Sequence, residues 1–467
     1  MSARRYCFLP ADAVRFCSSG PAPSKKAARP MLGCLVGSSA IGFTPAPRMA
    51  AAGEKPKIVV TGVGVVSALG SKDQFWDSLV KGECGIDQIS AFDASKFPTT
   101  IGAECKDFDP KPYFKSPKTV KSVDRYTHLA VAASALAVED AGMDVEKVDS
   151  TRLGVIIGSA FGGMETFEKQ TLALDANKKI SPFCIPALLG NTASGIVGIE
   201  MGAQGPNFGV ASACAAGSHA IGEAMRFMQN GEADIMITGG AEAAITPLSF
   251  GGFSAMKAMN SKYNDKPKEA SRPFDADRAG FVMGEGAGVL LLETEEHALA
   301  RGATIYCELG GYSATCDAHH ITTPHPEGAG LAACLTNALK DAGVEPSDVA
   351  YINAHGTSTA YNDKFETMAI KKVFGDSASK LAISSTKSMT GHTLGAAGGI
   401  EAAIAAKVMQ TGVCPPTINY NTEDPECDLN YVPNVALHLK EKPKAAISDN
   451  LGFGGHNAAL VFKQYIA

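Results

Sequence analysis

Hydrophobic runs alternate with stretches of helical periodicity along most of the chain. Residues 57–67 form a β-branched run that ends in glycines, and residues 121–141 place apolar side chains at helical spacing before Gly142. Further strands are expected at residues 155–158, 233–240, 288–293, 305–311, 349–355, 381–385, 436–439, 445–448 and 458–462. Further helices are expected at residues 328–343, 365–374 and 396–410. This alternation predicts an α/β fold.

Other stretches lack a clear period. Residues 71–120 and 249–283 are expected to be irregular, and residues 180–204 to form a loop and then a helix of small residues. Two parts, residues 56–304 and 305–467, both run strand, helix, strand, and both place reactive residues at strand ends. An internal duplication is therefore expected.

Residues 1–55 differ from the rest in composition. Arginine, lysine, serine and proline are frequent there, and Asp12 is the only acidic residue before Glu54. An acid-poor, Arg- and Ser-containing leader is typical of an organellar transit peptide. The apolar run at residues 31–42, too short to span a bilayer, is compatible with the signal-like part of a plastid leader. We therefore predict a disordered plastid transit peptide, with a mitochondrial address or an unaddressed tail as alternatives.

Composition narrows the function classes. The 467 residues are 45% hydrophobic, enough for a large core, and the formal net charge of -6 gives no footprint for nucleic acid and no general attraction to an anionic membrane. The 12 cysteines are scattered without a CxxC pair or zinc spacing. These features favour a reducing compartment with at most one reactive thiol.

Residues 209–220 (GVASACAAGSHA) run from an apolar strand into a helix of small residues, with Cys214 at the turn. A thiol there meets the positive end of the helix dipole, which lowers the thiol pKa and favours the nucleophilic thiolate. Free backbone N–H groups at the same turn can hold an oxyanion. On this stretch alone, a nucleophile and a buried structural cysteine both remain open.

Histidine-bearing segments follow downstream of Cys214. His355 comes directly after an apolar strand in NAHGTST, where side chains reach the mouth of an open α/β sheet. His392 lies in the glycine-dense loop KSMTGHTLGAAGG together with Lys387, and the glycine turn LGFGGHN contains Phe453. Two such histidines beside a cysteine at a helix start indicate catalysis. Two further histidines are expected to be structural: His219 and His456.

These segments resemble the signature segments of β-ketoacyl-[acyl carrier protein] synthases of the elongating type, which use a Cys-His-His site. The resemblance covers about residues 57–466, and SRPFDADRAGFVMGEGAG (271–288) and KISPFCIP (179–186) add to it. It implies a thiolase-like fold of two duplicated α/β halves in a five-layered α-β-α-β-α arrangement, usually in a homodimer. The halves would be residues 56–304, with the cysteine, and residues 305–467, with both histidines.

The resemblance also implies the reaction. Cys214 would accept the growing acyl chain from an acyl carrier protein thioester. His355 and His392, as neutral hydrogen-bond donors, would promote decarboxylation of malonyl-[acyl carrier protein] and stabilise the enolate, with Lys387 supporting His392. The enolate would attack the Cys214 thioester, giving a 3-oxoacyl chain longer by two carbons. This is the acyltransferase step of type II fatty acid synthesis, and no metal or organic cofactor takes part in it.

Binding roles follow from the same resemblance. Backbone N–H groups of Cys214 and Phe453 would form the oxyanion hole. Phe453 would also gate the acyl pocket, which Phe161 would line at the dimer contact. Thr357 and Thr359 would hydrogen-bond the phosphopantetheine arm.

Two further features concern ions and charge. Some relatives bind a monovalent cation near Asn353, Glu401 and Ser448, but Asp449 stands here where Asn is common in the family. Acyl carrier protein is acidic, so a basic dock is expected despite the net negative charge. Candidates are Lys115, Lys118, Lys121, Arg125 and Lys262.

Several related classes fit less well. A thiolase needs a second cysteine near the C-terminal glycine turn, and an initiating synthase has Asn in place of His392. An inactive partner of a synthase heterodimer tends to lose Cys214, and a cysteine hydrolase does not need the second histidine or Lys387. A polyketide ketosynthase remains open, although no acyltransferase or carrier domain follows in the sequence. The preferred acyl length is not predicted.

Overall fold

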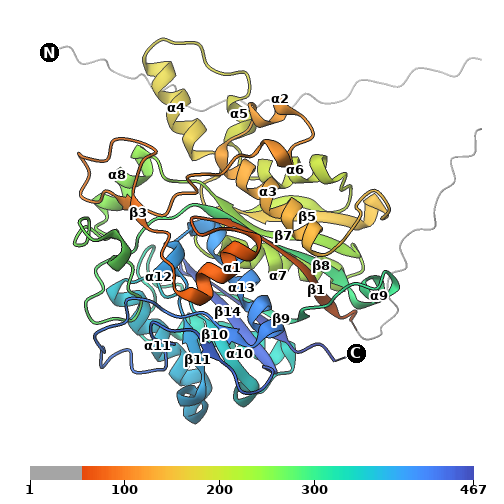
Figure 1. The fold of residues 1–467 in the computed structure, drawn as a ribbon, viewed down its shortest axis with the longest axis vertical. Coiled ribbons are helices and arrows are strands. Elements are labelled where there is room, and N and C mark those ends of the chain that lie inside the picture. Colours follow the sequence, from red (N-terminus) through yellow and green to blue (C-terminus); the bar gives the residue numbers. More distant parts are fainter. Residues whose placement is uncertain (1–54, 467) are drawn as a thin grey trace, which may run out of the picture. The chain divides into compact units, whose positions relative to one another are not determined.

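The computed structural model describes residues 55–466, so the predicted leader lies outside the described residues apart from Lys55. A mixed sheet forms the frame, with strands in the order β11-β10-β14-β15-β9-β1-β8-β7-β5-β6 (Figure 1). Its strands are β1 (Ile58–Ser67), β5 (Leu153–Gly158), β6 (Asn207–Val210), β7 (Ile235–Glu242), β8 (Gly286–Thr294), β9 (Cys307–Cys316), β10 (Val349–Asn353), β11 (Ala382–Ser384), β14 (Ala445–Gly452) and β15 (His456–Lys463). Short strands are β2 (Gly70–Ser71), β3 (Asp87–Gln88), β4 (Ile101–Gly102), β12 (Val413–Cys414) and β13 (Leu437–His438).

The strand order repeats between the first and second half of the sheet. In the first half β6, β5 and β7 are parallel, and β8 and β1 continue antiparallel. In the second half β11, β10 and β14 are parallel, and β15 and β9 continue antiparallel. The halves join where β1 pairs with β9 through Val59–Glu308 and Val60–Cys307. The expected duplication is confirmed by this topology.

Helices cover both halves in layers. Outside the first half lie α3 (Arg125–Asp140) and α6 (Thr192–Met201). Outside the second half lie α10 (Ala329–Ala342) and α11 (Ala360–Phe374). Between the halves lie α7 (Ala216–Gln229) and α13 (Ala397–Thr411), each packed against strands of both. The result is the expected five-layered α-β-α-β-α arrangement.

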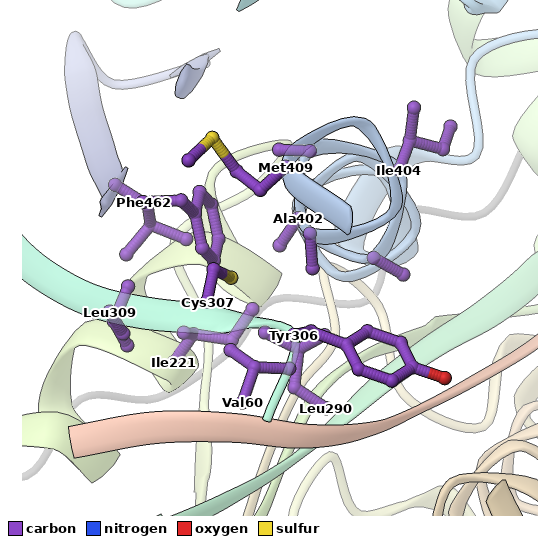
Figure 2. Packing of buried hydrophobic residues seen from close by; sticks show 14 of the residues in the cluster. Val60, Ile221, Leu290, Tyr306, Cys307, Leu309, Ala402, Ile404, Met409 and Phe462 are labelled. Atoms are coloured by element: carbon purple, nitrogen blue, oxygen red, sulfur yellow. The ribbon is translucent and has the colours of Figure 1, made fainter. Parts of the chain in front are cut away.

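The central layer is the main core of the described chain. Helix α13 (AGGIEAAIAAKVMQT) is buried on nearly every face, as its low polarity requires when sheets lie on both sides. Figure 2 shows Ile221 of α7 and Ile404 of α13 within one cluster that also contains Val60 of β1 and Phe462 of β15. One apolar core therefore joins the duplicated halves.

The central helices begin close together. A Cβ added to Gly217 of α7 would lie 2.7 Å from the backbone nitrogen of Gly399 in α13, which is closer than real side chains approach. Glycine at this contact allows the two backbones to meet directly. The helix starts, where Cys214 and His392 are found, are therefore held near each other.

Three helices differ from the expected irregular or unassigned stretches. Helix α1 (Lys72–Lys81) buries only Phe75, Ser78 and Leu79. This apolar face is short, and the charged residues around it leave no clear hydrophobic pattern in the sequence. Helix α8 (Pro247–Ala255) has no charged residue and buries only Ser249, Phe250 and Phe253, so its sequence shows no clear helical period. Helix α4 (Met164–Asp175) buries none of its residues and so carries no core-facing pattern.

The remaining helices are short. They are α2 (Pro117–Val120), α5 (Cys184–Leu188), α9 (Glu295–Ala300) and α12 (Lys387–Thr390). No helix in the described range is long and apolar enough to cross a membrane.

Candidate active site

Cys214 lies at the turn between β6 and α7, as the sequence predicts, and its side chain is buried. The preceding residue, Ala213, has φ of 51°, in the left-handed region that residues with a Cβ rarely adopt. Such a conformation costs about 1–2 kcal/mol, which the surrounding structure must offset. The sharp turn directs the thiol into a cavity rather than into the helix packing.

His392 is in direct contact with the thiol. Its Nε2 lies 3.1 Å from the Cys214 Sγ. The loop that carries it is fixed by backbone hydrogen bonds, because His392 N–H donates to Val282 O and Gly284 N–H donates to His392 O. The sulfur and imidazole are therefore in hydrogen-bonding contact without substrate.

His355 follows β10 and completes the cluster. Its ring centroid lies 5.3 Å from that of His392, with the two rings nearly perpendicular. The His355 N–H donates to Glu366 Oε1 at 2.6 Å, and the Gly356 N–H donates to Glu366 Oε2 at 2.8 Å. A buried carboxylate on α11 thus holds the loop that presents His355.

A buried network of hydrogen-bonded polar side chains lies next to the histidines and determines which ring nitrogen of His355 carries the proton. Lys387 forms an ion pair with Glu401, and Asn450 Nδ2 donates to the second Glu401 oxygen at 2.6 Å. Ser218 Oγ donates to the Asn450 Oδ1, which fixes the orientation of that amide. The Asn450 Nδ2 also lies 3.3 Å from His355 Nδ1, so that nitrogen accepts and Nε2 carries the proton.

Burial governs the charges of the three reactive groups. It lowers the pKa of His355 and of His392 well below the usual range, and the positive charge of Lys387 adds to both shifts. Both imidazoles are therefore neutral, as expected. Burial also raises the pKa of the Cys214 thiol to about 12, and the Lys387 charge opposes this only in part.

The expected lowering of the Cys214 pKa by the helix dipole is therefore wrong for the substrate-free protein. The thiol is buried, and the loss of hydration destabilises the thiolate more than the positive end of the helix dipole stabilises it. Deprotonation thus requires a nearby acceptor, and His392 Nε2 is in position to accept the proton.

Two backbone amides belong to residues that line the same cavity, Cys214 and Phe453. Among the described residues, neither the Cys214 N–H nor the Phe453 N–H donates to a backbone acceptor outside regular elements. Gly452 brings their segments together, because a Cβ there would lie 2.6 Å from Ser212 O and 3.4 Å from Cys214 N. Paired free N–H groups of this kind are suited to bind an oxyanion.

A cavity of about 460 Å³ lies over the thiol, and Cys214, both histidines, Phe453, Thr357 and Thr359 line it. The two threonine hydroxyls lie 2.8 Å apart. One wall is aromatic, since Phe253 packs within 5.2 Å of Phe281 and 6.3 Å of Phe453, measured between ring centroids.

Phe161 lies behind this wall rather than on the cavity surface. Its ring meets Phe253 edge-on at 6.1 Å, and 41% of the residue is exposed. The adjacent Glu242, at the end of β7, accepts from Ala160 N–H at 2.6 Å and from Gly395 N–H at 3.2 Å. Burial raises the pKa of Glu242 to about 7. This carboxyl joins the loop of Phe161 to the loop that leads from His392 into α13.

Asn353 Oδ1, Ser448 Oγ and Asp449 Oδ2 are among the buried side-chain oxygens that have no hydrogen-bond partner in the described part of the chain. Asn353 and Ser448 are register partners across β10 and β14. Oxygen donors of this type fit a hard cation. Glu401, the other member of the expected cation set, already accepts hydrogen bonds on both oxygens, from Lys387 and from Asn450.

Three residues that support the site were not predicted from the sequence. Asn450, Glu366 and Glu242 support the site from three different elements, yet none belongs to a reactive residue type in a loop motif. The available signal was weak: each is a polar residue inside an otherwise apolar or helical stretch. Of the proposed docking residues, Arg125 is not free, because its guanidinium donates to both Glu285 oxygens at 2.8 and 2.7 Å.

The fold and the cluster together define a thiolase-like protein with a Cys-His-His centre at the junction of duplicated halves. Comparison with known families agrees. The family model "Beta-ketoacyl synthase, N-terminal domain" matches residues 55–298, and "Beta-ketoacyl synthase, C-terminal domain" matches residues 306–421. The chain belongs to the β-ketoacyl synthase family, whose members are acyltransferases.

Individual relatives are similar over nearly their whole length. A 3-oxoacyl-[acyl-carrier-protein] synthase 2 of Synechocystis is 50% identical over 415 residues, covering 88% of this chain and 99% of the relative. The protein of the same name from Coxiella burnetii is 47% identical over 414 residues, covering 88% of this chain and 99% of the relative. A solved β-ketoacyl synthase from Burkholderia phymatum has a TM-score of 0.82 at 34% identity, covering 88% of this chain and 100% of that one.

A further solved structure contains a carrier protein. It is described as a type II polyketide acyl carrier protein in complex with its ketosynthase, and the matched chain has a TM-score of 0.81 at 35% identity, covering 88% of this chain and 100% of that one.

Proposed function

We infer that the protein is a 3-oxoacyl-[acyl carrier protein] synthase of type II fatty acid synthesis. The observation that carries this function is the contact of Cys214 Sγ with His392 Nε2 at 3.1 Å, with His355 beside it and both Cys214 and Phe453 lining the same cavity. The 47–50% identity to fatty acid synthases of this type favours it over polyketide synthesis, where the similar chain is 35% identical.

In the first half-reaction His392 Nε2 takes the thiol proton as the Cys214 sulfur attacks the acyl thioester carbonyl. The amides of Cys214 and Phe453 bind the oxyanion of the tetrahedral intermediate. The carbon–sulfur bond to phosphopantetheine then breaks, and the departing thiolate takes up the proton that His392 received from the Cys214 thiol. Cys214 now carries the acyl chain.

In the second half-reaction the malonyl carboxylate leaves as CO2. The electron pair of the broken carbon–carbon bond forms an enolate, whose oxygen accepts hydrogen bonds from the N–H groups of neutral His355 and His392. The enolate carbon attacks the Cys214 thioester, the Cys214 thiolate leaves, and the 3-oxoacyl chain remains on the carrier protein. Burial lowers the pKa of both imidazoles, with the Lys387 charge adding to the effect, and this favours the return of His392 to the neutral form before decarboxylation.

The binding roles are proposals of the same kind. Thr357 and Thr359, which line the cavity, bind the phosphopantetheine arm. Phe453 gates the acyl pocket, and Phe161 limits it from behind Phe253. A monovalent cation would be held by Asn353, Ser448 and Asp449. The exposed candidates for docking acidic acyl carrier protein are Lys115, Lys118, Lys121 and Lys262.

The enzyme assay uses protein lacking residues 1–55, incubated with acyl- and malonyl-[acyl carrier protein]. We expect a 3-oxoacyl product and CO2 in equal amounts. Cys214→Ala should abolish carbon–carbon bond formation while retaining CO2 release, because both histidines remain. Cys184→Ala, which removes a half-buried thiol that does not line the cavity, is the matched control and should behave as wild type. Hydrolysis of the acyl thioester by wild type without any condensation product would contradict the proposal.

We propose further that the chain acts as a homodimer in the plastid, with the mitochondrion as the alternative. The organelle rests on residues 1–55, an Arg-containing, acid-poor extension that precedes the family match at residue 55. The division into residues 56–304 and 305–467 follows the repeated strand order. Residues 1–60 fused to a fluorescent protein should direct it to plastids in plant cells. A diffuse cytosolic signal would exclude a transit peptide.

A further inference from the structure

His219 connects two segments that are distant in the sequence. The ring belongs to α7, five residues after Cys214, and its Nδ1 lies 2.6 Å from the Ser212 Oγ. Its Nε2 lies 3.3 Å from the main-chain oxygen of Asn457. Because a carbonyl only accepts, Nε2 must carry the proton and Nδ1 must accept from the Ser212 hydroxyl. Burial lowers the pKa of His219, which keeps the ring in the neutral form that this bridge needs.

The two bridged segments supply the two free amides of the site. Ser212 precedes Cys214 by two residues, and Asn457 follows the turn at residues 453–455 that starts with Phe453. Gly452, on the other side of that turn, lies against Ser212 O without a side chain between them. The His219 ring bridges the Ser212 segment to the Asn457 segment directly, whereas the Ser218–Asn450 hydrogen bond joins α7 to β14 before the turn.

The oxyanion hole depends on the distance and direction between these amides. One amide belongs to the first half of the fold and the other to the β14–β15 turn of the second half. The contact of Gly452 with Ser212 O alone would allow the two segments to shift relative to each other. The two hydrogen bonds of the rigid His219 ring restrict that shift. We propose that His219 is a positioning residue of the oxyanion hole, fixing the Phe453 N–H relative to the Cys214 N–H. This inference rests on the proposed synthase function.

The proposed role of His219 predicts different effects on two reactions of the Cys214 sulfur, acylation and alkylation. Acyl transfer to Cys214 places negative charge on a carbonyl oxygen and so needs both amides. Alkylation by iodoacetamide displaces iodide at a saturated carbon and creates no oxyanion. A residue that positions the amides should affect the first reaction only, whereas general disorder around Cys214 should affect both.

The test compares wild type with His219→Leu, which removes both hydrogen bonds. We expect the maximal rate of Cys214 acylation by acyl-[acyl carrier protein], followed by mass spectrometry, to fall by about tenfold to a hundredfold. The carrier concentration at half-maximal rate, the iodoacetamide rate and malonyl decarboxylation should change by less than about twofold. His219→Gln, whose amide can both accept and donate, should recover part of the lost rate.

Further variants keep the test decisive. Ser212→Ala removes one of the two bonds and should give a smaller loss of the same kind, and the double variant should be no slower than His219→Leu alone, since both act through one bridge. If His219→Leu does not fold, the Ser212→Ala comparison decides. His456→Leu, which removes a neighbouring ring with its centroid 6.4 Å from that of His219, should match wild type.

The outcomes are distinguishable. If wild type is never acylated, the synthase function fails. If wild type is acylated and the His219 and Ser212 variants are acylated equally fast, or if acylation and alkylation fall together, the positioning role is overturned.

Discussion

The Cys214 thiol and the imidazoles of His355 and His392 are all uncharged before substrate enters, because burial disfavours the charged form of each group. Burial raises the pKa of the thiol and lowers the pKa of both imidazoles. Lys387 is the nearby cation, and it is already paired with Glu401. The proton of the thiol can therefore move within the site, from sulfur to the adjacent Nε2, without exchange with solvent.

Glu242 provides a residue-scale prediction about pH. Burial raises its pKa from 4.5 to about 7, with hydrogen bonds from Ala160 N–H and the Ser159 hydroxyl opposing the shift. A carboxyl with a raised pKa in the folded state stabilises the protein below its unfolded pKa, and this contribution is lost as pH rises through the folded pKa. Relative to Glu242→Gln, which does not titrate, wild type should lose roughly 3 kcal/mol between about pH 4.5 and pH 8.

Urea unfolding of both proteins at several pH values and one fixed protein concentration measures this difference. Glu327→Gln, at an exposed carboxyl, is the control and should follow wild type throughout. Parallel pH curves for wild type and Glu242→Gln would show that the buried carboxyl does not titrate as described.

At the scale of elements, strand β6 forms an edge of the sheet and pairs only with β5. Exposed apolar side chains gather on it and on the neighbouring segments, including Phe208 of β6, Ile199 of α6 and Phe167 of α4. An open, apolar edge strand favours pairing with another chain. A second copy meeting this edge would cover these side chains and also Phe161.

This surface gives a prediction for assembly. Wild type should sediment at twice the mass of one chain. Ile199→Glu, which places a charge on a residue that is 68% exposed in the single chain, should weaken the dimer by at least about a hundredfold, because a charge would be buried without a partner. Val435→Glu, at another exposed apolar residue, should leave the mass unchanged. A monomeric wild type, or an Ile199→Glu dimer of unchanged stability, would contradict the proposed interface.

Elements that bury most of their side chains were predictable from sequence, and those with a small buried face were not. Strand 57–67 and helix 396–410 read clearly because each buries most of its side chains. Helix α1 has only a short apolar face, and α4 has none within one chain, so neither produces a recognisable pattern. The reactive residues were found by their glycine-rich loops, whereas Asn450 acts through contacts across 232 residues to Ser218 that no local pattern contains.

At the scale of the whole described chain, the duplication explains why the site residues are so widely spaced in sequence. Cys214 precedes the central helix of the first half, and His392 precedes the central helix of the second. His355 follows β10, which occupies the position in its half that β5 occupies in the other. Neither half contains a complete cluster, so the site exists only when both are folded against each other.

The close start of α7 and α13, where Gly217 meets Gly399, has an electrostatic consequence. Both helices present the positive ends of their peptide dipoles toward the region between Cys214 and His392. Because these partial charges belong to the main chain, they neither titrate nor have to be recruited by rotating a side chain. A field that already points the right way before charge develops needs no reorganisation during the reaction, which is the form of stabilisation that contributes most to lowering a barrier.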